Sequence, residues 1–555
     1  MTTTTPAATA GPIAAKEAPT GPPGAGRRLR SALVDRLPLL IVLLLQCALA
    51  YRLANTAFED EALYVYAGHR ELDHLLHGVP VGENYASFFS GAPMLYPVAA
   101  AAIDGVLGLE GVRVFSLLLM LGSTALLWTT TRRLYGKAAA AIAAALFATS
   151  APTLFLGRLA TYDAAAVFLL ALALWLVVRT ARGPLLAVLA AAPPLVLAAG
   201  VKYAAALYLP TVLAAAVLAV PAGKAVTAGA ASTTGAVSPA GLVSEAPWRD
   251  WRRGVLRGLL LAGGVGLLLW GGLRLAGPQV RAGLSQTTVN RAAGSEPLAN
   301  ILRLSLVWGG WVFVLALAGV GFLTVRLVAV RRSGWAPVLL AGALSGSAVL
   351  ATVYQAHLGT SVSLHKHIGF GLLFAAPVAG AGLAGLSRIG RFGRIGRLGG
   401  LGRGGVPGIA VGVCGLLAFY AGHAAGPMYG GWPNSSGLVS TLRPLVTSGD
   451  AIYLVEEDEV PRYYLRTRTQ PQQWLNTYFF QYTGRDGSTL TDLPAYQAAI
   501  TDGHFQLIVL DDGPTAALDK QLTGVLEKAP NYHVIAKIPG ATSHGIQYFT
   551  VWQHT

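Results

Sequence analysis

Residues 162–182 read YDAAAVFLLALALWLVVRTAR, and this stretch decides the class of fold. Its central part, residues 164–181, is almost entirely apolar, and a helix needs about 20 such residues to cross the hydrocarbon core of a bilayer. Asp163 precedes the apolar run, and Arg179 and Arg182 mark its other end. Basic residues placed between apolar runs are typical of determinants of membrane topology. The stretch therefore predicts a transmembrane helix.

The composition of the whole chain also indicates a membrane protein. Of the 555 residues, 54% are apolar and only 12% are charged, whereas a soluble domain carries about 25% charged residues. The net charge of +15 comes from short basic clusters between apolar runs, which excludes a nucleic-acid partner as its explanation. The two cysteines, Cys47 and Cys414, lie inside apolar runs, so neither a disulfide framework nor a thiolate metal site is expected.

Further apolar runs along the chain predict about eleven transmembrane helices. The expected spans are 37–54, 113–131, 138–156, 164–181, 184–200, 203–220, 255–276, 301–325, 336–354, 368–386 and 406–425. No small-residue cleavage site convincingly ends the first run, so we expect it to be a retained helix rather than a signal peptide. The fold class is therefore an all-α polytopic membrane protein.

Lysine and arginine counts near the span ends predict the orientation. Every second loop is basic, with clusters at 27–36, 132–137, 179–182, 224–257, 326–332 and 388–403. Because cytoplasmic loops carry the excess of these residues, we expect the N-terminus in the cytoplasm. An odd number of spans then places residues 426–555 outside. The expected location is a bacterial plasma membrane, crossed many times.

Composition divides the membrane part into segments. Residues 1–36 are expected to be a disordered cytoplasmic tail, and residues 37–425 form the transmembrane domain. Residues 221–254 and 387–405 are predicted to be cytoplasmic loops of low complexity. Residues 55–112 are predicted to be a long outer loop with interfacial helices, because the apolar piece from Tyr96 to Glu110 is too short to span.

The tail, residues 426–555, has the patterns of a small extracytoplasmic α/β domain. Ala451–Val455 and Gln506–Leu510 are short apolar runs typical of buried strands, and Thr515–Lys528 has helical periodicity. His533–Ile538 and Gln547–Trp552 are predicted to be further strands.

The most prominent candidate site residues are three adjacent carboxylates, Glu59, Asp60 and Glu61, just after the first span. Neighbouring negative charges repel, which raises the pKa of at least one carboxyl group and suits a general base. The alternative is a solvated start of an acidic loop. The same motif continues to Tyr64, a candidate for substrate binding.

Two further candidates lie in the tight outer turn between the third and fourth spans, and one lies at a helix break. Arg158 and Asp163 belong to the turn; for Asp163 the structural alternative is a helix N-cap. Lys202 lies in the short break between the fifth and sixth spans. It either contacts a phosphate at the membrane surface or extends to the interface as an ordinary lysine at an exposed helix break.

Two more outer features complete the set. His365, Lys366 and His367 stand together before the tenth span, and three donors that can carry positive charge suit an anionic head group. The alternative is an interfacial basic cluster. In the segment from Gly91 to Pro97, two prolines bracket a turn that is expected to shape the outer loop.

These residues resemble a known family. Asp60-Glu61 after the first span looks like the acidic motif of the membrane glycosyltransferases with the C-type fold. Within that group the closest similarity is to the branch of protein O-mannosyltransferases and aminoarabinose transferases, glycosyltransferase family 39-like enzymes that use sugars on polyprenyl phosphate. Asp163 resembles the second acidic position of this branch, and Gly200-Val201-Lys202-Tyr203 is similar to its lysine-containing junction.

The resemblance implies an inverting transfer of a sugar from a polyprenyl-phosphate carrier to an acceptor hydroxyl on the outer face of the membrane. Asp60 would be the general base, with Glu61 and Asp163 as further acidic site residues, and Lys202 would contact the carrier phosphate. The implied partners are the lipid-linked donor, membrane lipid and a protein, lipid or glycan acceptor. No cofactor is assigned. Some relatives use a divalent metal, for which Glu61 with an outer histidine is the candidate pair.

Two other classes of function stay open at this point. A lipid-linked sugar flippase or transporter would show internal repeats and polar groups at the bilayer midplane. A non-catalytic envelope assembly protein would need no outer cluster of acids and cations. If the protein is an enzyme, Asp60, Asp163 and Lys202 should meet in one place rather than point to separate surfaces.

Overall fold

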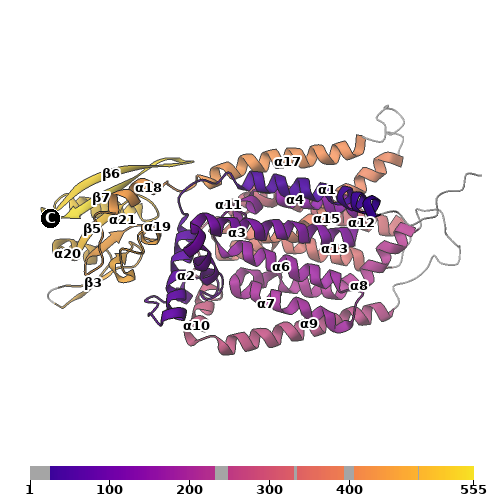
Figure 1. Ribbon diagram of the computed structural model, residues 1–555, viewed down its shortest axis with the longest axis horizontal. Coiled ribbons are helices and arrows are strands. Elements are labelled where there is room, and N and C mark those ends of the chain that lie inside the picture. Colours follow the sequence, from indigo (N-terminus) through magenta and orange to yellow (C-terminus); the bar gives the residue numbers. More distant parts are fainter. Residues whose placement is uncertain (1–24, 232–247, 330–333, 393–404, 485–486) are drawn as a thin grey trace, which may run out of the picture.

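The computed structural model describes residues 25–231, 248–329, 334–392, 405–484 and 487–555. Its membrane part is a bundle of roughly parallel helices, and the C-terminal domain lies beyond one end of the bundle (Figure 1). The long helices of the bundle are α1 (Ala25–Ala50), α3 (Tyr96–Tyr135), α6 (Tyr162–Arg179), α8 (Leu209–Ala231), α9 (Trp248–Leu275), α12 (Trp311–Ala329), α15 (Leu364–Phe392) and α17 (Gly405–Tyr429).

Further helices of the membrane part lie among the described residues. They are α2 (Glu59–His77), α4 (Lys137–Ala148), α5 (Ala151–Leu156), α7 (Ala192–Val201), α10 (Pro278–Thr287), α11 (Leu298–Ser305), α13 (Ala336–Gly346) and α14 (Leu350–Leu358). Short stretches of tighter or wider helix lie between several of them, at Tyr85–Ser87, Leu185–Ala191, Tyr203–Tyr208, Leu306–Gly310 and Ser347–Val349. Each predicted span overlaps one or more helices, although the first was expected to reach residue 54 and α1 ends at Ala50. Within the described part, seven helices are long and apolar enough to cross a membrane.

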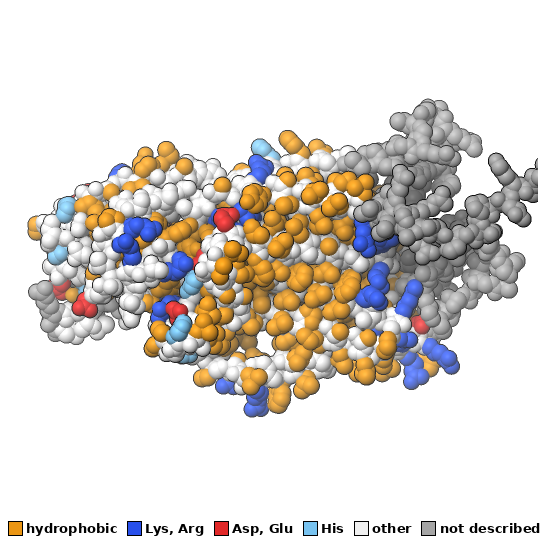
Figure 2. Space-filling model, in the orientation of Figure 1, with side chains coloured by type: hydrophobic (Ala, Val, Ile, Leu, Met, Phe, Trp, Pro, Cys, Tyr) orange, Lys and Arg blue, Asp and Glu red, His pale blue; other side chains and the backbone are white. Residues whose placement is uncertain are grey.

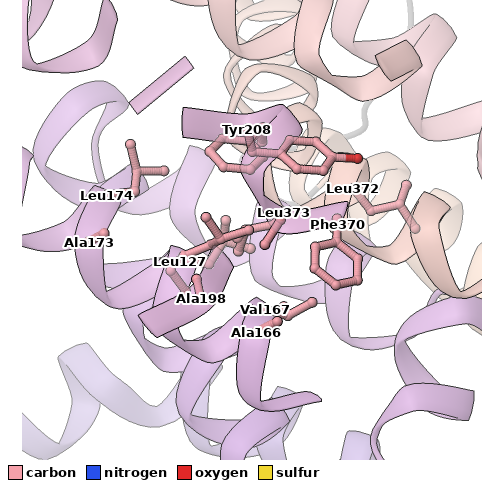
Figure 3. Close-up of a cluster of buried hydrophobic side chains, with 14 of the residues drawn as sticks. Leu127, Ala166, Val167, Ala173, Leu174, Ala198, Tyr208, Phe370, Leu372 and Leu373 are labelled. Atoms are coloured by element: carbon pink, nitrogen blue, oxygen red, sulfur yellow. The ribbon is translucent and has the colours of Figure 1, made fainter. Parts of the chain in front are cut away.

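Helix α15 lies at the centre of the bundle. In the most apolar 18-residue window of Leu364–Leu386, 94% of the residues are buried, a larger share than in any other candidate span among the described residues. The helix packs against α4, α12 and α13. Beside it, the ring of Tyr208 stacks on Phe374 with ring centroids 5.3 Å apart. Figure 3 shows Tyr208, Phe370 and Leu373 within this apolar cluster. The bundle is thus held together by packing around one central helix.

The outside of the bundle is an apolar belt. Figure 2 shows hydrophobic side chains covering the helical part of this face, with lysine and arginine side chains gathered at the end away from the C-terminal domain. Lipid chains solvate such a surface, and helices satisfy their own backbone hydrogen bonds inside a bilayer. The prediction of an all-α polytopic membrane protein with a small C-terminal α/β domain is confirmed.

Several predicted boundaries were wrong, because helices extend further than the apolar runs do. The expected disordered tail already becomes helix α1 at Ala25. Helix α8 continues to Ala231 and α9 starts at Trp248, so both ends of the loop predicted at 221–254 are helical. The rest of that predicted loop, 232–247, lies outside the described residues. Likewise α15 extends to Phe392 and α17 starts at Gly405.

The outer loop is largely helical. Helix α2 contains the acidic motif, and the predicted interfacial helix from Tyr96 is the first part of α3. Gly108, with a φ of 66°, separates this part from the spanning part of the same helix. The outer loop therefore presents its acidic motif from an ordered helix end rather than from a solvated coil.

The C-terminal domain is built on one five-stranded sheet with the order β2-β1-β5-β7-β6. Its strands are β1 (Ile452–Val455), β2 (Trp474–Leu475), β5 (Phe505–Leu510), β6 (Tyr532–Thr542) and β7 (Gly545–His554), with a separate hairpin of β3 (Gln481–Thr483) and β4 (Thr489–Thr491). Strands β2, β1 and β5 run parallel to one another. Strand β7 pairs in an antiparallel manner with both β5 and β6. The helices are α18 (Ser436–Leu442), α19 (Glu459–Tyr464), α20 (Asp492–Thr501) and α21 (Ala516–Leu526).

Alternation along the strands builds a core on each face of the sheet. Leu454 and Ile508 face α20 and α21, where they pack with Tyr496. Tyr453 and Leu507 face the other way, into a second core that includes residues of α18. Both sheet faces are therefore covered, as in α/β domains with a parallel centre.

Helix α19 attaches the C-terminal domain to the outer helices of the bundle. The Tyr463 hydroxyl donates to Asp104 Oδ1 at 2.6 Å, and Arg466 donates to Asp104 Oδ2 at 2.8 Å. Arg462 pairs with Glu83 and lies over the ring of Tyr66. These contacts place the domain directly beside α2, where the acidic motif begins.

We predict that the C-terminal domain is outside the cell and the basic end of the bundle is inside, because the basic clusters agree on one side. In a variant without Cys47 and Cys414, Ala517→Cys should react with a membrane-impermeant maleimide in intact cells. Lys137→Cys, at an exposed position of the opposite end, is the matched control and should react only after permeabilisation. The reverse labelling pattern would mean that the orientation is inverted, and labelling of both positions from the same side would mean that the span count between them is wrong by an odd number.

Candidate active site

Asp60 sits in the first turn of α2 and is bound from two directions. The Tyr64 hydroxyl, one helical turn later, donates to Asp60 Oδ1 at 2.9 Å. The Lys366 ammonium group donates to Asp60 Oδ2, although the two residues are 306 positions apart in sequence. Lys366 is buried, while the Asp60 side chain keeps 24% of its surface exposed. Asp60 is therefore an accessible carboxylate held by a buried cation.

A second buried ion pair lies nearby. Lys202 Nζ is 3.6 Å from Asp163 Oδ1, and both side chains are almost completely buried. The prediction that Lys202 occupies an exposed helix break is thus wrong, because the break itself is packed inside the protein. The N-capping alternative for Asp163 also fails, since neither of its carboxylate oxygens accepts a hydrogen bond.

Two tyrosines connect the ion pairs. The Tyr162 hydroxyl lies 2.7 Å from that of Tyr64, and their ring centroids are 4.2 Å apart. Lys202 Nζ lies over the Tyr162 ring, 4.5 Å from its centroid. Asp60 and Lys202 thus meet in one cluster with Asp163, as we expected of an enzyme. Tyr162 was missed, because a tyrosine beside a helix start carries no recognisable signal.

The outer loop holds the break around Lys202 through its backbone. The N–H of Ala92 donates to Gly200 O, and the N–H of Tyr203 donates to Ser90 O, both at 2.8 Å. A Cβ atom on Gly91 would lie 2.0 Å from Val201 O, so only glycine permits this approach. The segment predicted to shape the loop therefore also fixes the position of Lys202.

The three consecutive residues 365–367 do not act as one cationic cluster. Lys366 alone reaches Asp60. The His365 ring instead packs edge-on against Phe155, with centroids 4.9 Å apart. His367 Nδ1 lies 3.1 Å from Gln355 Nε2, in a buried contact with α14. Successive residues of a helix point about 100° apart, which separates the three side chains.

Glu61 differs from Asp60 in having no exposed surface, and each of its oxygens accepts two hydrogen bonds. Arg113 binds it with two hydrogen bonds, Nε to Oε1 at 2.9 Å and Nη2 to Oε2 at 2.6 Å. The backbone N–H of Ala160 donates to Oε1 at 2.7 Å, and that of Phe58 donates to Oε2 at 2.9 Å. Glu61 is completely buried. With these partners it does not fit the metal-ligand role considered from the sequence.

Arg158 belongs to this supporting network. Its guanidinium group binds Glu110, which also accepts a hydrogen bond from Arg113, and it lies over the ring of Tyr51. Arg113 itself was missed, because its position suggested only the first residue of a span. The Glu61–Arg113 pair ties the start of α2 to α3 and to the turn before α6.

The Glu59 and Asp60 carboxyl groups of the acidic motif differ in pKa. Burial, the neighbouring charge of Asp60 and that of Glu457 together raise the pKa of Glu59 to about 8. Burial alone would raise the pKa of Asp60 as well, but Lys366, Lys202 and the Tyr64 hydroxyl together outweigh it and keep that pKa below its ordinary value. The raised carboxyl group expected in the motif is therefore Glu59, and Asp60 is ionised at neutral pH.

Comparison with known proteins adds independent findings. Residues 94–244 match the family model described as dolichyl-phosphate-mannose-protein mannosyltransferase. The structure is similar to that of ArnT from Cupriavidus metallidurans bound to undecaprenyl phosphate, with a TM-score of 0.51, 16% identity, and coverage of 95% of this chain and 98% of that one. It is also similar to the oligosaccharyltransferase AglB from Archaeoglobus fulgidus, in complex with an inhibitory peptide and a dolichol-phosphate.

For AglB the TM-score is 0.54 at 11% identity, covering 93% of this chain and 74% of that one. No curated protein matches the sequence. At these identities the structural similarity concerns the fold, and it extends over nearly the whole chain, including the C-terminal domain.

We predict that Arg113→Met destabilises the protein strongly, because it leaves the buried carboxylate of Glu61 without its cation. Breaking a buried pair by removing one partner typically costs about 3–5 kcal/mol. The measurement is thermal unfolding of the purified protein in detergent. Lys137→Met, which removes an exposed partner of Asp35, is the control and should change the midpoint little. Equal effects of the two variants would contradict a structural role for the Glu61–Arg113 pair.

Proposed function

We propose that this chain, a membrane protein with the C-type glycosyltransferase fold, transfers a sugar from a polyprenyl-phosphate carrier to an acceptor hydroxyl group. The transfer takes place at the outer face of the plasma membrane. The observation that carries the proposal is the pair of buried lysines, Lys202 and Lys366, each bound to a carboxylate and linked through Tyr64 and Tyr162. Such a cluster offers both cations for a phosphate and a carboxylate for a proton.

The lysines are suited to the phosphate of the donor. Charged groups in a membrane protein are costly and generally mark a functional site. Before the donor binds, Asp163 and Asp60 compensate the charges of Lys202 and Lys366. The guanidinium group of Arg291 is also close enough for its charge to act on Lys202. A carrier phosphate would exchange with the carboxylates as the partner of these cations.

In the proposed reaction the acceptor oxygen attacks the anomeric carbon from the face opposite the phosphate. The new bond joins this carbon to the acceptor oxygen, and the bond from the carbon to the phosphate oxygen breaks. Its electron pair leaves with the phosphate, whose charge Lys202 and Lys366 neutralise. Asp60 takes the proton of the acceptor hydroxyl, since its partner Lys366 then contacts the phosphate instead. The anomeric configuration is inverted.

The remaining residues support these steps. Asp163 is a second acidic site residue that positions Lys202, and Tyr64 orients Asp60. Glu61 and Arg158 hold the helix ends on which the site is built, which makes them positioning residues rather than catalytic ones. His365 packs against Phe155, and His367 contacts Gln355, on either side of Lys366 in sequence.

The competing functions account for less of the site. A transporter would place its polar groups near the bilayer midplane, whereas here they gather at the end of the bundle next to the C-terminal domain, where α2 and α19 pack together. An assembly protein without catalysis has no need to bury two lysine–carboxylate pairs, because such pairs contribute little to stability compared with apolar packing.

We predict that Asp60→Asn lowers turnover by about a hundred- to ten-thousand-fold, the usual cost of losing a general base. Binding of the lipid donor should persist, because both lysines are retained and the donor phosphate itself supplies a counter-charge to Lys366; thermal unfolding of Asp60→Asn shows whether the unpaired Lys366 destabilises the free protein. Turnover is measured with a polyprenyl-phosphate sugar, beside binding of undecaprenyl phosphate. Glu59→Gln removes the adjacent carboxyl group and is the matched control, with turnover expected near that of the wild type. Full activity of Asp60→Asn together with loss in Glu59→Gln would assign the base to Glu59.

We predict that Lys202 binds the donor phosphate. Because Lys202→Met alone leaves Asp163 buried without a partner, the informative variant is Lys202→Met combined with Asp163→Asn, which removes both charges of the pair. This double variant should unfold near the wild-type temperature but bind undecaprenyl phosphate at least about tenfold more weakly, the equivalent of about 1.4 kcal/mol. Asp163→Asn alone should bind at least as tightly as the wild type, since a negative charge is removed. Wild-type affinity of the double variant would show that Lys202 serves only the structure.

A further inference from the structure

Three carboxylates gather in the C-terminal domain, away from the cluster around Asp60. Glu456 directly follows strand β1, Asp511 directly follows strand β5, and Asp519 lies on α21. All three are at most 3% exposed, and each offers an oxygen atom within 4.8 Å of those of the other two. Strands β1 and β5 are parallel neighbours, so the group lies at the carboxyl edge of the sheet, where α/β domains commonly bind ligands.

Glu456 is fixed by the loop after β5. Its Oε1 accepts hydrogen bonds from the Thr515 N–H at 2.6 Å and the Thr515 hydroxyl at 2.8 Å. Its Oε2 accepts from the N–H groups of Asp511 at 3.2 Å and Gly513 at 3.1 Å. These bonds wrap the loop around the carboxylate and turn Asp511 toward it.

The two aspartates, in contrast, are incompletely satisfied. Asp511 Oδ1 and Asp519 Oδ1 are buried and have no hydrogen-bond partner. Among the described residues, no lysine or arginine forms an ion pair with any of the three carboxylates. A buried charge without a partner is costly, and proteins usually compensate it with an opposite charge or a metal. The structure thus leaves two orphaned oxygen atoms in a group of three acids.

Gly513 lies directly against two oxygens of this group. A Cβ atom on Gly513 would lie 3.1 Å from Asp511 Oδ1 and 3.5 Å from Glu456 Oε1. Any other residue at this position would place its side chain against both oxygen atoms. Glycine therefore leaves both oxygen atoms uncovered by a side chain at this position.

We propose that Glu456, Asp511 and Asp519 bind a divalent cation, with Ca²⁺ as the ion of first choice. The donor set consists of carboxylate oxygens alone. Hard cations prefer such oxygen ligands, whereas zinc and other softer metals favour nitrogen or sulfur. Ca²⁺ accepts irregular oxygen geometry, whereas Mg²⁺ demands a near-ideal octahedron. The site is separate from the transfer reaction proposed above and does not depend on it.

The position of the site gives the cation a structural consequence. The segment that follows Glu456 leads directly into α19. Tyr463 of this helix and Arg466 just after it bind Asp104 of the outer helices. Glu457 in the same segment is close enough for its charge to act on Glu59. A cation that joins the ends of β1 and β5 would therefore fix the segment through which the C-terminal domain meets the acidic motif.

The test uses the full-length protein in detergent after removal of divalent ions with EDTA. Addition of CaCl₂ should raise the unfolding temperature of the wild type in a saturable manner, and calorimetric titration should give one bound ion per chain. Asp511→Asn and Asp519→Asn should each weaken Ca²⁺ binding at least about tenfold, whatever their own unfolding temperatures, because affinity follows the charge count of the ligands. MgCl₂ and ZnCl₂ are the comparison ions.

Asp512→Asn is the matched control. Asp512 is exposed, adjacent to Asp511, and its φ of 54° is one that asparagine also tolerates. This variant should bind Ca²⁺ like the wild type. The proposal is overturned if none of the three ions binds to or stabilises the wild type, or if Asp511→Asn and Asp519→Asn bind Ca²⁺ as tightly as Asp512→Asn does. Tighter binding of Mg²⁺ or Zn²⁺ than of Ca²⁺ would overturn the choice of ion.

Discussion

The ion pair between Asp60 and Lys366 is the interaction around which the outer end of this protein is organised. A lysine near the start of the most deeply buried helix needs a counter-charge, because an apolar environment does not solvate an ammonium group. Asp60 provides it from the first turn of α2. The central helix of the bundle and the outer loop are therefore held together by this ion pair. Movement of the loop away from the helix would leave a buried cation without its counter-charge.

The Glu61–Arg113 pair makes this arrangement rigid. Two adjacent residues of α2 point in different directions, one toward the site and one into the protein. Arg113 and two backbone N–H groups occupy both oxygens of Glu61, so the helix end has no freedom to turn Asp60 away. Preorganised supports of this kind are what allow a charged group to act without reorganising its surroundings.

Sequence reasoning selected most residues of the cluster around Asp60 but not the contacts between them. Asp60, Asp163, Lys202 and Lys366 could be selected because charges at span ends are rare and costly. The orientation of each residue within a helix turn could not be read, so Glu61 and Asp60 received similar roles although only Asp60 has an exposed carboxylate. The burial of Lys202 was missed for a related reason, since it depends on a backbone contact with Gly91 that no local pattern announces.

Long-range clusters were the other limit. Glu456 and Asp511 are 55 residues apart, and they meet only because parallel strands end at the same edge of a sheet. The prediction of strands at 451–455 and 506–510 was confirmed within a residue of each end, yet strand order cannot be derived from two short apolar runs. The acids became a group only when β1 and β5 were seen to be neighbours.

Charge balance also explains how the proposed site can remain stable without its donor. Two lysines and two carboxylates sum to zero, so the empty cluster carries no net charge in an environment that penalises one. A phosphate that enters must compete with Asp60 and Asp163 for the lysines, and this competition lowers donor affinity. The entering phosphate also releases Asp60 from Lys366. Loss of the neighbouring positive charge raises the basicity of the Asp60 carboxylate when the acceptor hydroxyl must lose its proton. Binding of the donor and activation of the base would then be one event.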